Sequence, residues 1–265
     1  MEAGKLRIIQ ISDTHLYADA ERDLLGVKTQ ESFRAVVELL RQNETATQLI
    51  LLSGDLSQDY TEGSYIRLAE MLKPFQIPVY YVPGNHDDPK MMTHVYPRET
   101  FSNHKHVILK NWQIILLNSH VSKSVAGSLD VSQLAYMQHC LQAYPEHRAI
   151  IMFHHQPIPV GCEWLDKLGL LNADEFWKIA AHYPNIHTVL FGHVHQEFSA
   201  VKNNVHCYSA PSTCIQFKRK QNNFGLEELP PGYRWIDLYD DGRLETAVVR
   251  VAHYVGVFDG HAKGY

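Results

Sequence analysis

Side chains of the types that bind metal ions follow five apolar stretches of this chain, each at the point where the stretch ends. The five groups are Asp13-Thr14-His15, Gly54-Asp55, Gly84-Asn85-His86-Asp87, His154-His155 and Gly192-His193-Val194-His195. Any one of them has an ordinary explanation, because Gly, Asn and Asp are common turn residues and a histidine can be a hydrogen-bonded member of a core. Five such groups at equivalent places in one chain are not explained by turns. They predict a shared ligand-binding site.

The chemistry of that site follows from the kinds of donor atoms. A set of seven ligands, with three carboxylate or amide oxygens and four imidazole nitrogens, can be drawn from these groups, and none of the groups has a thiolate. This mixture suits Mn, Fe, Co or Zn, and suits neither Ca nor a cysteine-rich structural zinc. Seven ligands are too many for one ion that must also hold water, but they match two ions that share a carboxylate. Two ions about 3.5–4 Å apart stabilise both oxygens of an in-line displacement at phosphorus, so the residues predict phosphoester chemistry.

The stretches before these groups have the pattern of buried β-strands. Their apolar residues run on without polar alternation, which is typical of strands covered on both faces. The expected strands are residues 6–12, 48–53, 78–82, 112–118, 149–153 and 187–191. Because the carboxyl ends of the strands converge on one crevice in open α/β sheets, the five groups should meet in space.

Helical spacing of apolar residues between these strands completes an α/β pattern. The expected helices include residues 33–40, 65–72, 134–141 and 176–183. After residue 200 the pattern is all β, and residues 233–239 and 244–251 flank Asp240-Asp241-Gly242 as the strands of a hairpin.

Composition excludes several classes of protein. A chain of 265 residues with 45% hydrophobic and 20% charged residues is typical of a globular protein, and we expect one domain over residues 1–265. The net charge of −5 and the pI near 6.4 argue against nucleic acid or an anionic membrane as partner. No apolar stretch approaches 18 residues and the N-terminus lacks a signal-peptide core, so we expect a cytoplasmic protein. Four cysteines without a CxxC pair indicate reduced core thiols.

The motifs DxH, GD, GNHD, HH and GHxH, in this order, resemble those of the binuclear metallophosphoesterases, also called calcineurin-like phosphoesterases. The resemblance covers about residues 5–215 and leaves a C-terminal hairpin region at about 230–252. A narrower resemblance is to the bacterial class III 3′,5′-cyclic-AMP phosphodiesterases. It rests on ISDTHLYA, LLGV, GDLSQD, PGNHDD, HHQPIPVGCEWLD, FGHVHQE and PSTCIQF. The implied fold is a four-layer α/β/β/α sandwich with two mixed sheets and the metal site at the carboxyl ends of their strands.

The resemblance also implies which residues bind the metal ions. Asp13, His15 and His195 would bind one ion. Asn85, His154 and His193 would bind the other, and Asp55 would bridge both. Only one of two adjacent side chains on a strand can face the ions, and the family pattern favours His154 over His155. Residues implied at the substrate are His15, Asp55, Asn85, His86 and His195.

In this scheme His86 is catalytic and is not a ligand. A hydroxide that bridges the two ions would attack phosphorus in line, and His86 would stabilise or protonate the departing ribose 3′-oxygen. Asp87 would orient the His86 ring, or Asp87 and Asp88 would cap a helix that begins with Pro89; both interpretations stand.

The function implied is hydrolysis of 3′,5′-cyclic AMP to 5′-AMP by a monomer or homodimer. Its cofactors would be two divalent transition-metal ions per chain, Fe or Mn by preference and Co or Zn as alternatives. Two other functions stay open. One is a metallophosphoesterase for glycerophosphodiesters or nucleotides, and the other is a scaffold of the same fold without catalysis. The sequence further suggests that the long aperiodic segment 155–173 borders the substrate, and that His120 is an ordinary surface or core histidine.

Overall fold

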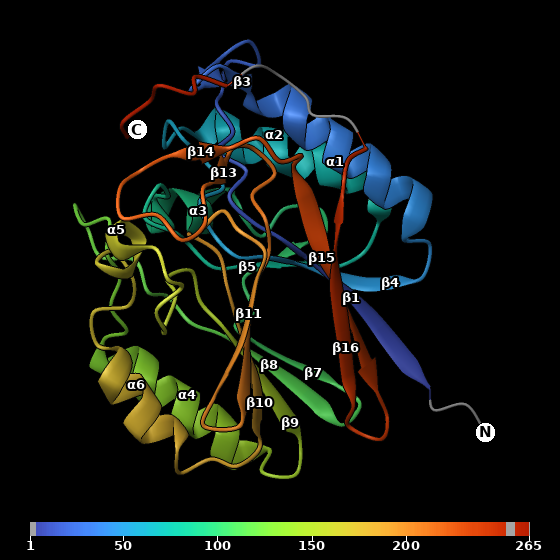
Figure 1. Ribbon diagram of the computed structural model, residues 1–265. Helices are drawn as coiled ribbons and strands as arrows, with labels where there is room; N and C mark the ends of the chain where they lie inside the picture. Colours follow the sequence, from blue (N-terminus) through green and yellow to red (C-terminus); the bar gives the residue numbers. More distant parts are fainter. Residues whose placement is uncertain (1–3, 253–257, 265) are drawn as a thin grey trace.

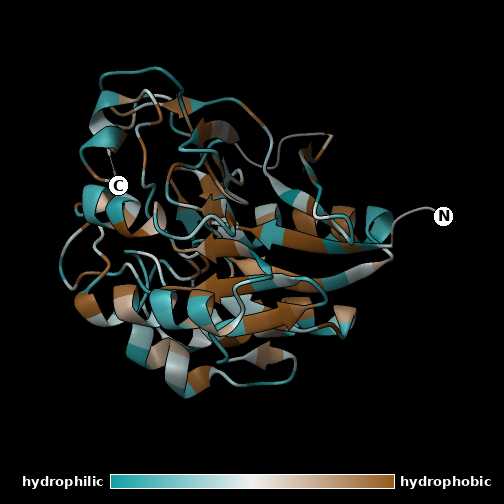
Figure 2. Cartoon of the chain, turned by 90° about the horizontal axis from the view of Figure 1, so that it is seen from below, coloured by the Kyte–Doolittle hydropathy of each residue, from teal (hydrophilic) through white to brown (hydrophobic). Residues whose placement is uncertain are grey.

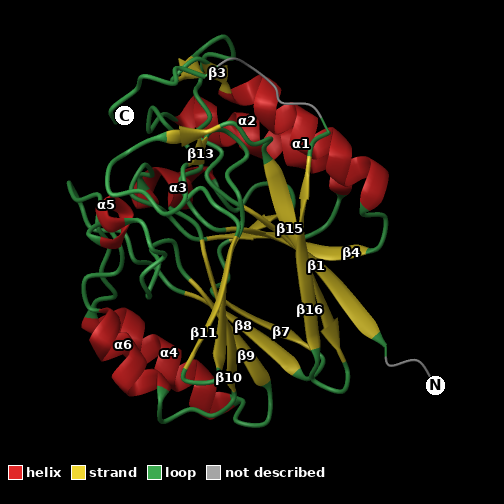
Figure 3. Ribbon diagram, viewed as in Figure 1, coloured by secondary structure: helices red, strands yellow, loops and turns green. Residues whose placement is uncertain are grey.

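Two six-stranded β-sheets lie face to face, and α-helices cover the outer face of each (Figures 1 and 3). The computed structural model describes residues 4–252 and 258–264. The predicted four-layer α/β/β/α sandwich with two mixed sheets is confirmed.

The first sheet has a parallel centre and an antiparallel edge. Its strand order is β16-β15-β1-β4-β5-β6, in which β1, β4, β5 and β6 are parallel and β15 and β16 are antiparallel additions. The bounds are β1 Lys5–Ile11, β4 Thr47–Leu52, β5 Val79–Tyr81, β6 Phe101–Ser102, β15 Gly232–Tyr239 and β16 Leu244–Arg250. The last two strands pair across the turn where the sequence predicts a hairpin.

The second sheet repeats this plan with both edges antiparallel. Its order is β11-β12-β10-β9-β8-β7, with β8, β9, β10 and β12 parallel. The bounds are β7 His106–Leu109, β8 Trp112–Leu116, β9 Arg148–Met152, β10 Ile186–Phe191, β11 Phe198–Lys202 and β12 Val205–Ser209. Two small antiparallel pairs lie outside the sheets: β2 Asp23–Leu24 with β3 Val27–Lys28, and β13 Gln216–Phe217 with β14 Leu226–Glu227.

The helices divide between the two outer layers. Helices α1, α2 and α3 lie over the first sheet, and α4 and α6 lie over the second (Figure 1). The bounds are α1 Thr29–Asn43, α2 Glu62–Leu72, α3 Pro89–Val95, α4 Val131–Ala143, α5 Glu163–Asp166 and α6 Ala173–Ala180, with a 3₁₀ turn at Lys73–Phe75. The four helices predicted from apolar spacing are all present, although α6 ends three residues earlier than its pattern.

Alternate residues of each central strand belong to different apolar layers. In β1, Ile9 and Ile11 pack with Phe33 and Val36 of α1, whereas Ile8 packs between the sheets beside Trp112. This two-sided burial explains the unbroken apolar runs in the sequence, and Figure 2 shows the strands as the most hydrophobic part of the cartoon. Truncating a fully buried side chain such as Phe33 to alanine should cost about 3–5 kcal/mol of stability.

The four cysteines are buried and unpaired, as expected. Among the residues that the structure describes, no helix has the length and apolar character that crossing a membrane requires.

Candidate metal centre

The five predicted groups meet where the carboxyl ends of five strands come together. Asp13 and His15 follow β1, Asp55 follows β4, and Asn85 follows β5 of the first sheet. His154 follows β9, and His193 and His195 follow β10 of the second sheet. Six of the seven predicted ligands are buried, and Asn85 is half-buried. Residues separated by up to 182 positions therefore share one site.

Four of the predicted ligands form a tight cluster. One donor atom from each of Asp13, His15, Asp55 and His195 lies within 4.8 Å of the others. The His195 Nε2 is 3.4 Å from the Asp13 Oδ1 and 3.1 Å from the His15 Nε2. Two carboxylates and two imidazoles at these separations match the donor set of one transition-metal ion.

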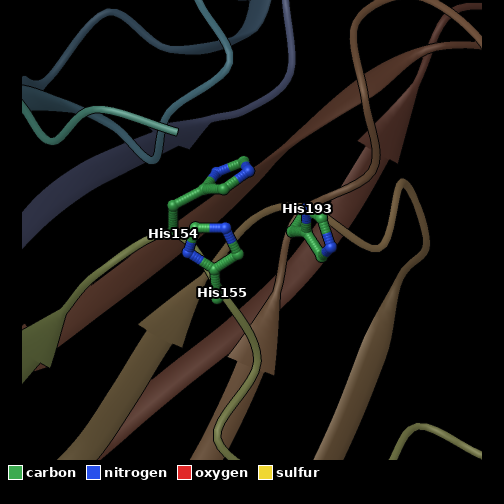
Figure 4. Close-up of side chains that lie close together, drawn as sticks. All are labelled: His154, His155 and His193. Atoms are coloured by element: carbon green, nitrogen blue, oxygen red, sulfur yellow. The ribbon is translucent and has the colours of Figure 1, made fainter. Parts of the chain in front are cut away.

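A second group of donors lies beside the first and shares Asp55 with it. The His154 Nε2 is 3.2 Å from the Asp55 Oδ2 and 3.2 Å from the Asn85 Oδ1. The same Asp55 oxygen is 3.9 Å from the His15 Nε2 in the first cluster. The His193 ring centroid is 5.1 Å from that of His154 (Figure 4). Asp55 thus faces both groups.

His155 lies in this second group, but its ring forms hydrogen bonds with other residues of the protein. Donor atoms of His154, His155 and His193 fall within 4.8 Å of one another (Figure 4). However, the His155 Nδ1 is 2.8 Å from the Ser119 Oγ and its Nε2 is 3.1 Å from the Val125 carbonyl oxygen. Both ring nitrogens are therefore occupied by protein, whereas the His154 Nε2 is directed at Asp55 and Asn85.

Metal ions fit these residues, because buried ligand atoms of both groups lack a partner in the protein. The Asp13 Oδ2 and the His193 Nε2 are buried and make no hydrogen bond within residues 4–252 and 258–264. Buried polar atoms normally have a partner, and each that lacks one calls for an explanation. A dinuclear metal site supplies it.

The opposite ring nitrogens are held by the protein. The Nδ1 atoms of His15, His154 and His195 lie 2.6 Å from the Gln58 Oε1, 2.7 Å from the Ser53 carbonyl and 2.9 Å from the Ile215 carbonyl, respectively. Such partners fix the tautomer and the ring orientation of a metal-binding histidine and leave Nε2 for the ion.

The backbone at the site is strained. Five predicted ligands have a left-handed backbone, with φ between 45° and 68°: Asp13, His15, Asp55, His193 and His195. Non-glycine residues rarely adopt this conformation, and residues that do so cluster at functional sites. Gly54 has φ 96°, and a Cβ there would lie 2.5 Å from the His154 Nδ1, so only glycine fits before Asp55.

Burial and the two carboxylates set the protonation of the rings. Burial lowers the pKa of His15 to about 3 and holds that of His193 well below its usual value, so both rings are neutral, the form that can bind a metal ion. At His154 burial acts in the same direction, but the charge and hydrogen bond of Asp55, together with Asp13 and the Ser53 carbonyl, raise the pKa to about 9. Without metal, Asp55 and His154 therefore form an ion pair.

His86 lies beside the ligands without belonging to either group. Its backbone N–H donates to the Asp55 Oδ1 at 2.7 Å, and its half-buried ring is 5.2 Å from the His15 ring, centroid to centroid. Burial lowers the pKa of the His86 imidazole, and the charge of Asp55 opposes this shift.

The structure gives Asp87 a different task from either prediction. Asp88, and not Asp87, caps helix α3, accepting from the backbone N–H groups of Lys90 and Met91. The Asp87 carboxylate instead accepts from three backbone N–H groups and one hydroxyl: those of Gly84, Leu56, Ser57 and Tyr65. It therefore ties the Asn85 turn to the Asp55 turn. Burial, followed by the charge of Asp55, raises the pKa of Asp87 to about 7.

A cavity of about 730 Å³ opens beside Asn85 and His86. Its walls are Tyr60, the turn from Asn85 to Lys90, and a loop that contributes His120 and residues 122–125. Sequence reasoning missed Tyr60 and the loop, and it dismissed His120, because none of them belongs to a motif. The segment 155–173, which was expected to border the substrate, contributes no residue to this cavity. Its Trp164 packs on Phe217 and Phe224 instead.

Comparison with known proteins agrees with the class that the site defines. Residues 6–197 match the model of the calcineurin-like phosphoesterase family, and the chain belongs to that family. It is 38% identical to the 3′,5′-cyclic adenosine monophosphate phosphodiesterase CpdA of Escherichia coli (strain K12), over 99% of this chain and 96% of that protein. It is 37% identical to the protein of the same name from Vibrio vulnificus, over 100% of this chain and 97% of that protein.

The fold is shared much more widely than the sequence. A dimetal phosphatase from Danio rerio superposes with a TM-score of 0.65 at 12% identity, covering 93% of this chain and 99% of that one. At this identity the likeness concerns the fold alone.

Proposed function

We propose that this protein hydrolyses 3′,5′-cyclic AMP to 5′-AMP with two divalent metal ions. The observation that carries the proposal is the pair of donor groups that share Asp55 at the edge of a cavity large enough for a nucleotide. The CpdA relatives, similar over nearly the whole chain, support cyclic AMP as the substrate.

We assign the predicted ligands to two metal ions according to the two donor groups described above. Asp13, His15 and His195 would hold the first ion, Asn85, His154 and His193 would hold the second, and Asp55 would be shared by both. His154 takes precedence over His155 because the His155 ring already binds Ser119 and Val125. Iron or manganese suits this mixture of oxygen and imidazole donors, with cobalt or zinc as alternatives.

The ions would supply Lewis acidity at the phosphate and a water molecule acidic enough to attack at neutral pH. The chain's own residues would orient the substrate and stabilise or protonate the leaving group. Following the family resemblance, we assign contacts with the phosphate to His15, Asp55, Asn85 and His195, of which Asn85 lines the cavity. The His86 ring lines the cavity, so it can reach the ribose 3′-oxygen as that oxygen departs. An anionic phosphodiester beside this ring favours its protonated form, which offsets the effect of burial on its pKa.

A second candidate is hydrolysis of other small phosphodiesters by the same centre. Glycerophosphodiesters and nucleotides carry the same reacting group, and the cavity is open enough to admit them. Nucleic acid is disfavoured by the net charge of −5, because a groove for its backbone is normally basic. A scaffold without catalysis would be free to lose ligands, yet all seven and His86 are present. We also propose that the protein is cytoplasmic and acts as a monomer or homodimer. Its substrate is a small molecule, and neither nucleic acid nor a membrane is its partner.

A substrate panel tests the proposal. Protein reconstituted with Mn²⁺ or Fe²⁺ is assayed on cyclic AMP, cyclic GMP, 2′,3′-cyclic AMP, glycerophosphodiesters and an aryl phosphodiester. We expect 5′-AMP from cyclic AMP, without release of inorganic phosphate. If cyclic AMP is inert with every metal while a glycerophosphodiester is cleaved rapidly, the second candidate replaces the first.

A further inference from the structure

The cavity beside the metal centre has two walls that come from different sheets. Tyr60 and the Asn85–Lys90 turn follow strands β4 and β5 of the first sheet, and residues 120–125 follow β8 of the second. The metal ligand Asn85 and the proposed acid His86 lie at the edge where the cavity meets the ions. Whatever part of the substrate extends past His86 therefore enters this space.

An apolar side chain stands exposed on each wall. Tyr60 and Val125 are each 48% exposed, two of the seven large apolar side chains that are exposed among the described residues. A tyrosine from one wall and a valine from the other give this cavity apolar surface of the kind that a flat ring contacts. Single exposed apolar residues are ordinary, but two that line one cavity next to a catalytic centre indicate a ligand.

The Tyr60 wall is rigid. Tyr60 has a left-handed backbone with φ 59°, an uncommon state for an aromatic residue. Its N–H donates to the Ser57 Oγ at 2.9 Å, and the Ser57 N–H in turn donates to the Asp87 Oδ1 at 3.1 Å. The carboxylate that ties the two metal-binding turns together thus also positions the tyrosine.

The Val125 wall is anchored by His155. The ring of His155 bridges the Ser119 Oγ and the Val125 carbonyl, the two ends of the segment that forms the wall. Gly127 lets the loop close on this ring, because a Cβ there would lie 2.1 Å from the His155 Nδ1. The Ser128 N–H closes the loop by donating to the Ser119 carbonyl at 3.0 Å. The wall is therefore preformed, and it is fixed by the residue next to the ligand His154.

We propose that this cavity binds the nucleoside of the substrate, with the base held between Tyr60 and Val125, and that these two residues determine the preference for a cyclic nucleotide. The inference rests on the proposed function, since a 3′-oxygen that leaves past His86 carries the ribose and base with it. His155 is a positioning residue that acts through the Val125 loop. Lys90 and Lys123, one on each wall, attract the anionic substrate to the entrance.

The proposal is tested by the steady-state kinetics and ligand binding of three variants, Tyr60→Ala, Tyr60→Phe and Val125→Asp. The matched control is Val201→Asp, a substitution on β11 at a side chain that is 61% exposed. Each variant is assayed with cyclic AMP and with methyl 4-nitrophenyl phosphate, which has no nucleoside. Binding of the slowly hydrolysed Rp phosphorothioate analogue of cyclic AMP is measured by calorimetry, and bound metal is counted. Stacking of a base on an aromatic ring corresponds to roughly fivefold to 150-fold in affinity.

We expect Tyr60→Ala and Val125→Asp to raise KM for cyclic AMP and Kd for the analogue at least tenfold, with both ions retained and kcat little changed. The same variants should change KM for methyl 4-nitrophenyl phosphate much less. Tyr60→Phe should bind the analogue about as tightly as the parent, and Val201→Asp should have the KM and Kd of the parent. If Tyr60→Ala binds the analogue as the parent does, the inference is overturned while cyclic AMP hydrolysis still stands. If the parent protein turns over no cyclic AMP yet binds the analogue through Tyr60, the proposed function fails and the binding site stands.

Discussion

The floor of the site, made of the seven predicted ligands, differs in construction from the walls of the cavity beside it. Six of the seven floor residues are buried, five have left-handed backbones, and three of the histidine rings accept or donate a hydrogen bond at Nδ1 that fixes their orientation. The apolar side chains of the walls are about half exposed, and only their backbones are fixed. Both regions follow the carboxyl ends of strands, but one wall follows β8, which carries none of the seven residues.

The difference assigns separate tasks to the two regions. A metal centre needs donors placed within a few tenths of an ångström, and strain is tolerated there because the surrounding structure holds each residue in place. A wall needs only to offer a surface of the right shape, so its side chains can change without disturbing the metals. Changes in the floor should therefore affect every substrate alike, and changes in the walls should affect only substrates that reach them.

The largest effect is expected at Asp55, the one floor residue that faces both groups of ligands. Asp55→Ala should abolish turnover of cyclic AMP and of an aryl diester, and it should weaken the binding of both ions. His15→Ala, the matched variant on one side only, should mainly disturb one ion. Elemental analysis with activity assays distinguishes the two. An Asp55→Ala protein with two ions and substantial activity would show that Asp55 is not a bridge.

His86 stands between floor and wall, and its variant should separate substrates. His86→Ala should keep both ions yet lose about 10²–10⁴ in kcat on cyclic AMP, roughly 3–5 kcal/mol of barrier. The loss should shrink on a nitrophenyl diester, because an acidic phenol departs without a proton. Equal losses on both substrates together with depleted metal would make His86 a ligand or a structural residue.

His154 and His155 are neighbours in sequence that we assign to different regions. His154→Ala should lose the second ion, whereas His155→Ala should keep both ions and lose about 2–4 kcal/mol of stability, because it empties a buried position and leaves Ser119 unpaired. Metal analysis and urea denaturation of the two variants test the assignment. Loss of an ion from His155→Ala, with His154→Ala fully loaded, would reverse it.

The smallest expected effect is the release of protons when the metal-free protein binds metal ions. Burial lowers the pKa of His154, but the charge and hydrogen bond of Asp55, with Asp13 and the Ser53 carbonyl, together raise it to about 9 in the metal-free chain. This ring is therefore protonated at pH 7 and must lose its proton to bind an ion. Metal uptake at pH 7 should therefore release at least one proton, and apparent affinity should fall about tenfold for each pH unit below that pKa. Calorimetry in two buffers of different ionisation enthalpy measures this. Uptake without proton release would mean that His154 is neutral before the ion arrives.

Much of the floor could be predicted from the sequence, because its signals are local. Six apolar runs predicted the central strands to within a few residues, and each predicted ligand lies within four residues of the end of one of them. The walls could not be predicted, because Tyr60 and Val125 belong to no motif and become neighbours of the site only through the packing of two sheets. The same holds for His155 and Asp87, whose tasks depend on contacts with loops distant in sequence. The left-handed backbones at Asp13 and His195 also have no sequence signal, since neither residue is glycine.

The central claim is that two ions held by these seven residues carry out the reaction. Metal-free protein is titrated with Mn²⁺ while bound metal and cyclic AMP hydrolysis are followed on the same samples. Activity should reach its maximum only at two ions per chain, with 5′-AMP as the product. Full activity at one ion per chain would contradict the binuclear account.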